Sequence, residues 1–450
     1  MMRFTGLVLT VLFYTSVAAQ ENSPYSRYGL GDIAPNHPIV TRGMGGIAAG
    51  FSDFQSINFI NPASYGSLGY VDPAVIKTNP NYQRSTIFDI GAEVDSRTLK
   101  STVPLSKFTS VNLNISYMQL GFPIKMKKAN KKGIFLGASF GLKPVSKINY
   151  KIAKLERQQG IDSLATIYEG NGGLNEVSTG LGIRIKNLSL GFNFGYAFGK
   201  KDYSSKLTFL NDTTHYYSSN SANKTNFSGT FFNAGLQYEI RLKQKAVIVL
   251  GAYGSLQQTL KGNQDIIRET ITTNANGSDI RIDSVFESTV RGNVTRPSTF
   301  GVGFTFRDSS GHWLFGADYE AAQWKDYRFF GQPDAVANSW KVRAGVEYYP
   351  ASYNTNIKKY FNFVRYRFGF NYGPDYIKVN NNLREYGFTF GAGFPLKLRR
   401  GFFETQSSML NTAIEIGSRG DKNSNLREST FRISFGLSLG DLWFRRYKYD

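Results

Sequence analysis

Residues 188–198, LSLGFNFGYAF, decide the fold of this chain. Alternate positions are apolar and mostly aromatic, and the positions between them are small: Leu188, Leu190, Phe192, Phe194, Tyr196 and Phe198 against Ser189, Gly191, Asn193, Gly195 and Ala197. A strand places these two sets on opposite faces, whereas a helix would mix them around its circumference. The stretch therefore predicts a β-strand with one aromatic face.

The same alternation recurs along the chain and predicts about fourteen strands. They lie near 84–93, 111–123, 133–143, 177–186, 188–200, 227–241, 245–260, 298–307, 312–324, 340–350, 361–373, 384–398, 411–418 and 429–440. Each apolar face continues for roughly ten residues, the length that a tilted membrane-spanning strand needs.

The opposite face of these strands distinguishes a membrane barrel from a soluble sandwich. It consists mostly of Gly, Ser and Thr, whereas the wet face of a sandwich would carry surface charges. The connections also alternate between long polar stretches and short turns, as in outer-membrane barrels. We therefore expect an all-β, transmembrane antiparallel β-barrel in the outer membrane, with both termini in the periplasm.

The composition of the 450 residues fits this expectation. The chain contains 27 Tyr, 36 Phe and 46 Gly but no Cys, which excludes disulfides, thiol catalysis, cysteine-bound zinc and a lipoprotein anchor. The formal charge of +20 is spread along the chain without a nucleic-acid-binding module. We expect no nucleic acid as a partner, and expect contacts with outer-membrane lipid and lipopolysaccharide.

Three segments follow from this organisation. Residues 1–19 have the basic start, short apolar stretch and small residues of a signal peptide, with cleavage after Ala19. Residues 20–83 do not alternate and are expected to form a plug, or hatch, inside the lumen. Residues 84–450 are expected to form the barrel.

One strand changes phase. Val111, Leu113, Ile115 and Tyr117 share a face, but from Met118 onward the apolar residues fall on the opposite parity. A bulge or kink near Tyr117 and Met118 would restore the face. Such a kink could open the wall, although a bulge that only adjusts curvature is the simpler interpretation.

The hatch segment carries a run of small residues. Arg42-Gly43-Met44-Gly45-Gly46-Ile47-Ala48-Ala49-Gly50 is followed by Asn61-Pro62-Ala63 before the barrel. This arrangement resembles the FadL-type long-chain fatty acid transporters, and the chain ends, Ser23–Gly29 and Leu442–Arg446, are similar to Bacteroidota members. The resemblance implies a fourteen-stranded barrel plugged by its N-terminal segment and passive uptake of hydrophobic molecules. FadL-like barrels also include subunits of outer-membrane machines.

Six charged residues on three successive strands are expected to point into the lumen: Asp318, Glu320, Arg343, Glu347, Arg365 and Arg367. Antiparallel order brings Glu347 near Arg365 or Arg367. The arginines could attract an anionic headgroup, but a buried ladder of ion pairs that holds the hatch is the simpler interpretation, because buried charges are normally paired.

No chemistry beyond binding is expected. The three histidines, His37, His215 and His312, have no nearby partners of a catalytic arrangement. We expect no enzyme activity, cofactor or metal. The leading interpretation is a channel for fatty-acid-like molecules; the alternative is a non-transporting subunit of a secretion or barrel-assembly complex with envelope protein partners.

Basic residues gather at the periplasmic side of this topology. The turn from Lys125 to Lys132 holds five lysines, and the tail adds Arg445, Arg446 and Lys448. A solvated turn is the default interpretation, and docking of an acidic periplasmic partner is the sharper one.

Overall fold

The computed structural model describes residues 23–70, 85–102, 105–159, 162–210, 216–243, 245–274, 278–351, 359–379, 381–396, 407–420 and 426–441. The predicted signal peptide, His215 and the basic tail lie outside the described residues.

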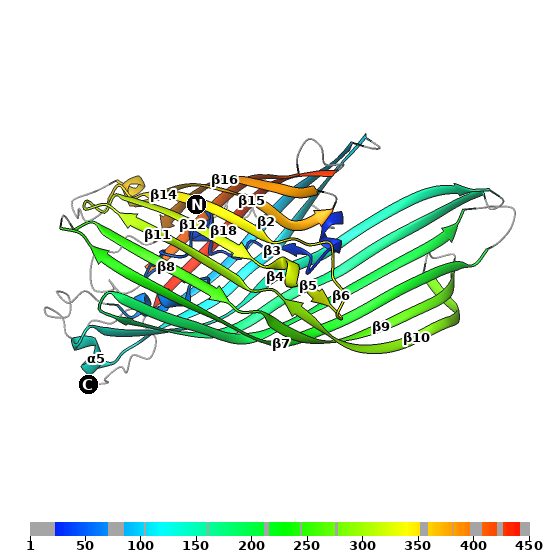
Figure 1. Ribbon diagram of the computed structural model, residues 1–450. Helices are drawn as coiled ribbons and strands as arrows, with labels where there is room; N and C mark the ends of the chain where they lie inside the picture. The colour runs from blue at the N-terminus through cyan, green and yellow to red at the C-terminus, as the bar shows by residue number, and fades with distance from the viewer. Residues whose placement is uncertain are drawn as a thin grey trace, which may run out of the picture.

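An antiparallel sheet closes on itself where β18 pairs with β2 (Figure 1). It contains eighteen strand segments, of which β1 and β13 have two residues each. The segments β8–β9 and β10–β11 are two strands that are each interrupted, so the barrel has fourteen strands. The predicted fold class, an all-β barrel of about fourteen strands, is confirmed.

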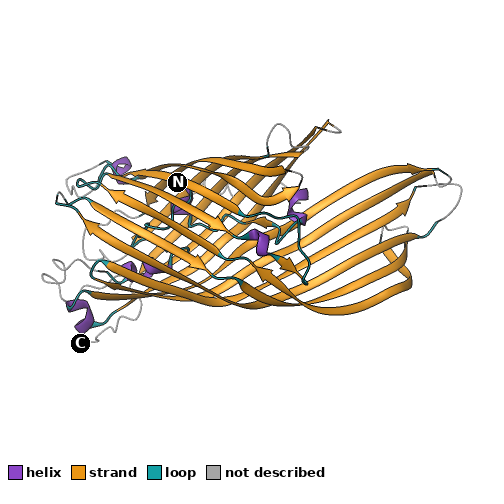
Figure 2. Cartoon of the chain, viewed as in Figure 1, coloured by secondary structure: helices purple, strands orange, loops and turns teal. Residues whose placement is uncertain are grey.

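The strands have the following bounds: β1 Asp32–Ile33, β2 Thr86–Thr102, β3 Leu105–Ile124, β4 Ile134–Gln158, β5 Asp162–Ile185, β6 Leu188–Phe209, β7 Ser218–Arg241, β8 Val247–Ser255, β9 Gln258–Thr273, β10 Asp279–Arg296, β11 Thr299–Arg307, β12 Trp313–Ala322, β13 Arg328–Phe329, β14 Ser339–Tyr348, β15 Arg365–Val379, β16 Asn381–Pro395, β17 Ser407–Arg419 and β18 Leu426–Asp441. The helical turns are short: η1 Pro24–Arg27, α2 Ile39–Arg42, η2 Pro62–Ser64, α3 Tyr65–Leu68, α5 Lys127–Lys131, η3 Trp324–Asp326 and η4 Tyr360–Phe363 (Figure 2). Among the described residues, no helix is long and apolar enough to span a bilayer.

The two faces of β6 separate as its sequence predicts. Phe192, Phe194 and Tyr196 are exposed on the outside of the barrel, whereas Ser189 and Asn193 are buried on the inside. The outward aromatic face suits lipid, and the small inward face leaves space in the lumen.

Several strands are much longer than the apolar alternation predicted. β4, β5 and β7 have 25, 24 and 24 residues, so most of the expected long loops at 144–176, 201–226 and 261–297 are paired strand. The expectation of loops was wrong because outward positions beyond the lipid are polar, and the hydrophobic pattern fades while backbone pairing continues. Strands β4 to β7, β9 and β10 project from one end of the barrel (Figure 1).

The opposite end carries the short connections. These include the turn at 186–187, the turn at 242–246 and the turn at 308–312, together with the turn that contains α5. The described strands begin and end at this same end, because Thr86 of β2 pairs with Asp441 of β18.

Candidate functional site

The N-terminal segment lies inside the barrel and forms two plugs. Residues 39–68 form the hatch, defined by α2, η2, α3 and the chain between them, and residues 23–34 form an upper plug nearer the long-strand end (Figure 1). Val40, Met44, Ile47 and Phe51 of the hatch form a buried apolar cluster with Leu314 of β12. Burial of these side chains anchors the hatch to the wall, with each contributing on the order of 1.5–3 kcal/mol.

Glycines on both sides let the hatch backbone approach the barrel wall. Gly45 has φ +70 and Gly46 has φ +85, in the left-handed region that L side chains rarely adopt. A Cβ on Gly369 of β15 would lie 2.0 Å from the Gly45 nitrogen, and one on Gly345 of β14 would lie 2.3 Å from the Met44 oxygen. The small inward faces that signalled a barrel are thus contact surfaces for the hatch.

The Asn-Pro-Ala motif closes the other side of the hatch. The Asn61 side chain accepts a hydrogen bond from the Ala63 backbone nitrogen and donates one to the Ala49 carbonyl at 2.7 Å. Pro62 and Ala63 pack against Gly191, where a Cβ would lie 2.2 Å from the Pro62 oxygen. The motif therefore caps η2 and joins the two halves of the hatch.

Arg42 connects the hatch to the wall through a buried ion pair. Its Nη1 lies 2.5 Å from Glu93 Oε2 on β2, and both side chains are almost fully buried. Its Nε donates to the His37 carbonyl at 2.9 Å, which also fixes the chain before α2. Sequence reasoning singled out Arg42 but missed Glu93.

The six predicted lumen charges all lie inside the barrel, and five of them form ion pairs with one another. Glu347 accepts from Arg365 at 3.1 Å and from Arg367 at 2.8 Å, and Arg343 lies 3.2 Å from Glu320.

Asp318 stands apart from these pairs because it accepts hydrogen bonds from backbone nitrogens of the hatch, Ala49 at 2.8 Å among them. This carboxylate and Arg365, whose Nη1 lies 3.9 Å from Asp53, connect the charged wall to the hatch.

The upper plug has an apolar side and a charged side. Tyr25 and Leu30 belong to a buried cluster with Trp324, Tyr327 and Tyr376 from the connections and strands at the long-strand end. The Tyr327 hydroxyl donates to the Gly29 carbonyl at 2.9 Å. These contacts close the lumen above the hatch.

The charged side of the upper plug centres on Asp32. Its carboxylate pairs with Arg97 of β2 and with Arg419 of β17, the latter at 2.7 Å. The sequence analysis did not select these residues. A signal existed, because Glu93, Asp95 and Arg97 fall on the inward parity of β2.

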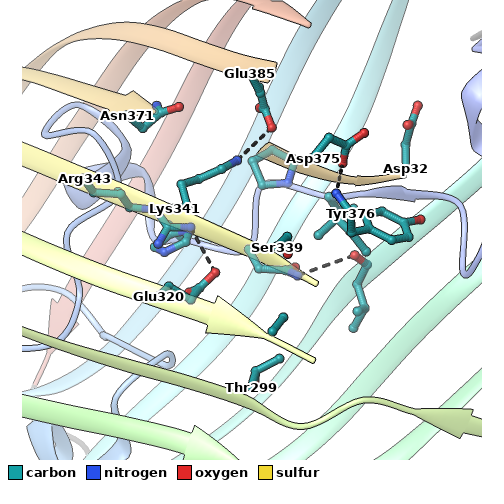
Figure 3. A pocket seen from close by; sticks show the side chains of 18 of the residues that line it. Asp32, Thr299, Glu320, Ser339, Lys341, Arg343, Asn371, Asp375, Tyr376 and Glu385 are labelled. Atoms are coloured by element: carbon teal, nitrogen blue, oxygen red, sulfur yellow. Dashed lines mark hydrogen bonds and ion pairs between the residues drawn. The ribbon is translucent and has the colours of Figure 1, made fainter. Parts of the chain in front are cut away.

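An internal cavity of about 380 Å³ lies between the two plugs (Figure 3). Acidic and basic residues from the wall and the plugs line it, including Asp32, Arg42, Glu320, Arg343, Lys341 and Glu385. Figure 3 shows Lys341 directed at Glu385, and their charged atoms are 2.9 Å apart. Apolar side chains share the lining, Phe231, Trp324 and Trp340 among them. The charged part suits water or polar groups, because desolvating these charges against an apolar solute would be costly.

The phase change in β3 coincides with a one-residue register shift. Ile115 pairs with Ala92 and Tyr117 pairs with Gly91, so Ser116 is the extra residue. Ser116 and Tyr117 are consecutive buried residues, whereas Ile115 and Met118 are exposed on the outside. The expectation that Tyr117 shares the outward face of Ile115 was wrong, because the extra residue is Ser116 and the phase changes before Tyr117. The shift restores the outward apolar face, as the sequence required.

The wall is split beyond this bulge. β3 pairs with β4 only from Met118 to Ile124, so residues 105–117 of β3 pair on their β2 side alone. The upper plug lies along the facing edge of β4: β1 pairs with Ser146 and Lys147, and the Ala34 nitrogen donates to the Val145 carbonyl at 2.9 Å. The N-terminal segment thus covers the β4 side of the split.

Two of the three histidines lie in the described part of the chain, and no metal site is found there. The described residues contain no group of three or more His, Cys, Asp or Glu side chains that could hold a metal ion. The His312 ring nitrogen Nδ1 contacts the Tyr349 carbonyl at 2.8 Å and lies beside Tyr348 in the short-turn region, which is a structural position. His37 lies between the hatch and the upper plug.

Solved structures with the same architecture are outer-membrane channels. The Pseudomonas putida toluene transporter TodX is 16% identical, with a TM-score of 0.54 over 92% of this chain and 99% of its own. The Ralstonia pickettii toluene transporter TbuX is 14% identical, with a TM-score of 0.54 over 91% and 99%. A Pseudomonas aeruginosa FadL homologue is 12% identical, with a TM-score of 0.54 over 92% and 99%. The fold is therefore that of a FadL-type outer-membrane β-barrel.

The family itself is shown by sequence. A family model described as BamG matches residues 1–450, and the chain belongs to the BamG family. No curated protein matches the chain in sequence.

A β-branched side chain at Gly369 is expected to displace the hatch. Gly369→Val would place a Cβ 2.0 Å from the Gly45 nitrogen. Because this neighbour is a backbone atom, the hatch itself has to move away. Limited proteolysis should then cleave residues 39–68 at least ten times faster, while heat-modifiable gel mobility shows an intact barrel. The control is Gly417→Val, where the nearest atom to a Cβ is 3.3 Å away; equal proteolysis of the two variants would contradict the role of close packing.

Removal of the Arg42 charge should weaken hatch docking by about 3 kcal/mol, because Glu93 is left buried with a lost partner. We expect Arg42→Met to lower the free energy of hatch opening, measured by native-state hydrogen exchange. The double variant Arg42→Met with Glu93→Gln should recover most of the lost free energy. The exposed Arg241→Met should change it by less than about 1 kcal/mol. If the double variant has the same free energy of hatch opening as Arg42→Met alone, the ion-pair argument is refuted.

Docking of the upper plug should weaken at low pH. Burial favours the neutral form of Asp32, but Arg97 and Arg419 outweigh burial and hold its pKa at about 2, below the ordinary 3.8. A carboxylate with a lowered pKa stabilises the folded state above the ordinary pKa, and that stability is lost as the pH falls through the folded pKa. Hydrogen exchange of residues 23–34 should therefore be constant at neutral pH and rise between pH 3.8 and about 2. Asp32→Asn should abolish this rise in hydrogen exchange. If the rise is unchanged in the variant, another group causes it.

Proposed function

We propose that this chain is a closed, non-transporting barrel subunit of an outer-membrane secretion or barrel-assembly complex. The observation that carries the proposal is a lumen blocked at two levels by the chain's own N-terminal segment. The hatch fills the lumen at the level of Gly345 and Gly369, and the upper plug closes it beside Trp324 and Tyr376.

Opening this lumen would be expensive. The hatch would have to leave Glu93 and Asp318, and the upper plug would have to leave Arg97 and Arg419. Breaking one buried pair by removing a partner costs about 3–5 kcal/mol. The charges that line the cavity would then oppose the passage of an apolar molecule.

The projecting strands supply a surface for a partner. β10 pairs with β9 along its length, but on its other side only Val294 and Thr295 pair, with β13. Its exposed apolar residues lie beyond the aromatic band of the barrel: Ile280, Ile282, Val285, Phe286 and Val290. Val285 is 70% exposed, an unusual state for valine in a soluble region unless a partner covers it.

The orientation that fits this role places the short turns in the periplasm and the projecting strands outside the cell. Outer-membrane barrels have short periplasmic turns and longer external connections. Trp313 and Tyr348 then lie in the inner aromatic girdle, where their rings pack 4.5 Å apart. The end of β18 would then lie on the periplasmic side, whereas Ser23, the first described residue, lies in the upper plug nearer the external end.

A channel for hydrophobic molecules is the second candidate. The split between β3 and β4 favours it, because the split would give a route from lumen to lipid if residues 23–34 left the edge of β4. The architecture is shared with structures titled as toluene transporters. This function would require both plugs to move.

Purification and flux measurements separate the two candidates. The chain extracted from its own outer membrane in mild detergent should co-purify with envelope proteins at fixed stoichiometry. Val285→Asp combined with Phe286→Ser should reduce that recovery at least five-fold, whereas Leu155→Asp on the opposite projecting edge should leave most of it.

Liposomes that contain the purified chain should take up toluene or oleate no faster than empty liposomes. Deletion of residues 23–68, which removes both the upper plug and the hatch, gives the matched opened form, which should pass small polar solutes. Saturable hydrocarbon uptake by the intact chain, with no co-purifying protein, would overturn the proposal in favour of a channel.

A further inference from the structure

Lysines crowd one part of the short-turn end. The turn that contains α5, the turn at 186–187 and the turn at 242–246 connect consecutive strands from β3 to β8, so they are neighbours on the rim. We define the lysine arc as the exposed residues of these turns: Lys128, Lys132, Lys186, Lys243 and Lys245. Lys125, Lys127 and Lys131 add further positive charge to the same sequence segment.

Backbone hydrogen bonds join the three turns into one surface. The Lys186 nitrogen donates to the Gly133 carbonyl at 2.9 Å, which ties the second turn to the first. The Glu239 nitrogen donates to the Asn187 carbonyl at 2.8 Å, which ties the third turn to the second. The lysines are therefore held on one continuous rim segment.

The acidic residue within this surface is already engaged. Glu239 lies 2.6 Å from Arg184 and 2.7 Å from Arg241, so its charge is used by two arginines. Its pairing leaves the charge of the lysine arc available to an outside partner.

Two of the lysines occupy strained backbone positions. Lys186 has φ 53 and Lys245 has φ 64, a region in which Gly or Asn is less costly than a long side chain. Asn187 stands directly beside Lys186, so the turn contains a residue better suited to that conformation. Lysine in this backbone conformation lowers the stability of the turn but adds a positive charge. Residues that cost stability in this way are often found at functional positions.

Among the described residues of the short-turn end, exposed lysines are most numerous on these three turns, and a single one, Lys359, lies in the connection between β14 and β15. The turn at 308–312, Asp-Ser-Ser-Gly-His, contains no Lys or Arg, and Asp308 accepts hydrogen bonds from its own turn. Lipid headgroups surround a barrel on every side and would attract basic residues evenly. Five exposed lysines on three neighbouring turns fit instead a partner that approaches this part of the rim.

We propose that the lysine arc is the docking site for an acidic surface of a periplasmic protein. The proposal rests on the subunit role argued above and names the chemistry of one partner. Exposed charges at the rim gain from a large opposite charge mainly through long-range attraction, which salt screens over about 8–10 Å. Association should therefore be fast and sensitive to ionic strength.

Site-specific photo-crosslinking in intact cells tests this docking. A benzophenone amino acid replaces Met126, an exposed residue at the start of α5, or Ser309 in the lysine-free turn as the positional control. The Met126 probe should give a discrete protein adduct whose crosslinked peptide is rich in Asp and Glu, and the Ser309 probe should not.

Neutralisation of the arc should then remove the adduct. Lys128→Gln, Lys132→Gln, Lys186→Asn, Lys243→Gln and Lys245→Asn together should reduce the Met126 adduct at least five-fold. The matched control neutralises five exposed lysines of the projecting strands and should change it less than two-fold: Lys151→Gln, Lys154→Gln, Lys200→Gln, Lys224→Gln and Lys261→Gln. Heat-modifiable mobility confirms that both variants fold.

The other outcomes overturn the inference. A phospholipid adduct at Met126 would assign the arc to the membrane surface, and an adduct unaffected by neutralisation would assign it no role. Stoichiometric co-purification that survives neutralisation, with the adduct unchanged, would leave the subunit function standing while the arc fails. If no protein co-purifies and no adduct forms, both the subunit function and the docking role of the lysine arc are contradicted.

Discussion

A ring of fourteen strands encloses more space than its own inward side chains fill, and the N-terminal segment occupies the excess. This constraint explains the composition of the inner wall. Where the hatch backbone comes closest, the wall presents Gly rather than a larger residue, as at Gly345, Gly369 and Gly191. The barrel and the hatch are therefore one packed unit, in which neither surface is complete without the other.

Charge gives this packing its specificity. Glycine contacts alone would let the hatch slide along the wall, but Arg42 on Glu93 and Asp318 on the Ala49 nitrogen fix its position. Buried pairs add little net stability compared with apolar packing, yet a hatch out of position would leave them unpaired at high cost. The same logic fixes the upper plug through Asp32, which two arginines hold from different strands.

The two plugs are also the basis of the proposed subunit function. A split wall would offer a route into lipid only from an open lumen, and here the split is lined on the β4 side by β1. What remains accessible is the outside of the molecule: the edge of β10 at one end and the lysine-bearing turns at the other. Both surfaces suit contacts with other proteins better than passage of a solute.

The sequence by itself determined the barrel, its strand number, the phase change before Met118 and the inward direction of the lumen charges. These features follow from alternation, which is a local property of each strand. Only the tertiary structure decided that polar stretches such as 144–176 continue as paired strands, since backbone pairing outside lipid leaves no hydrophobic pattern. It also decided which charges meet: Asp32 finds Arg97 and Arg419 because barrel closure and the path of the plug bring distant segments together. No spacing in the chain encodes that meeting.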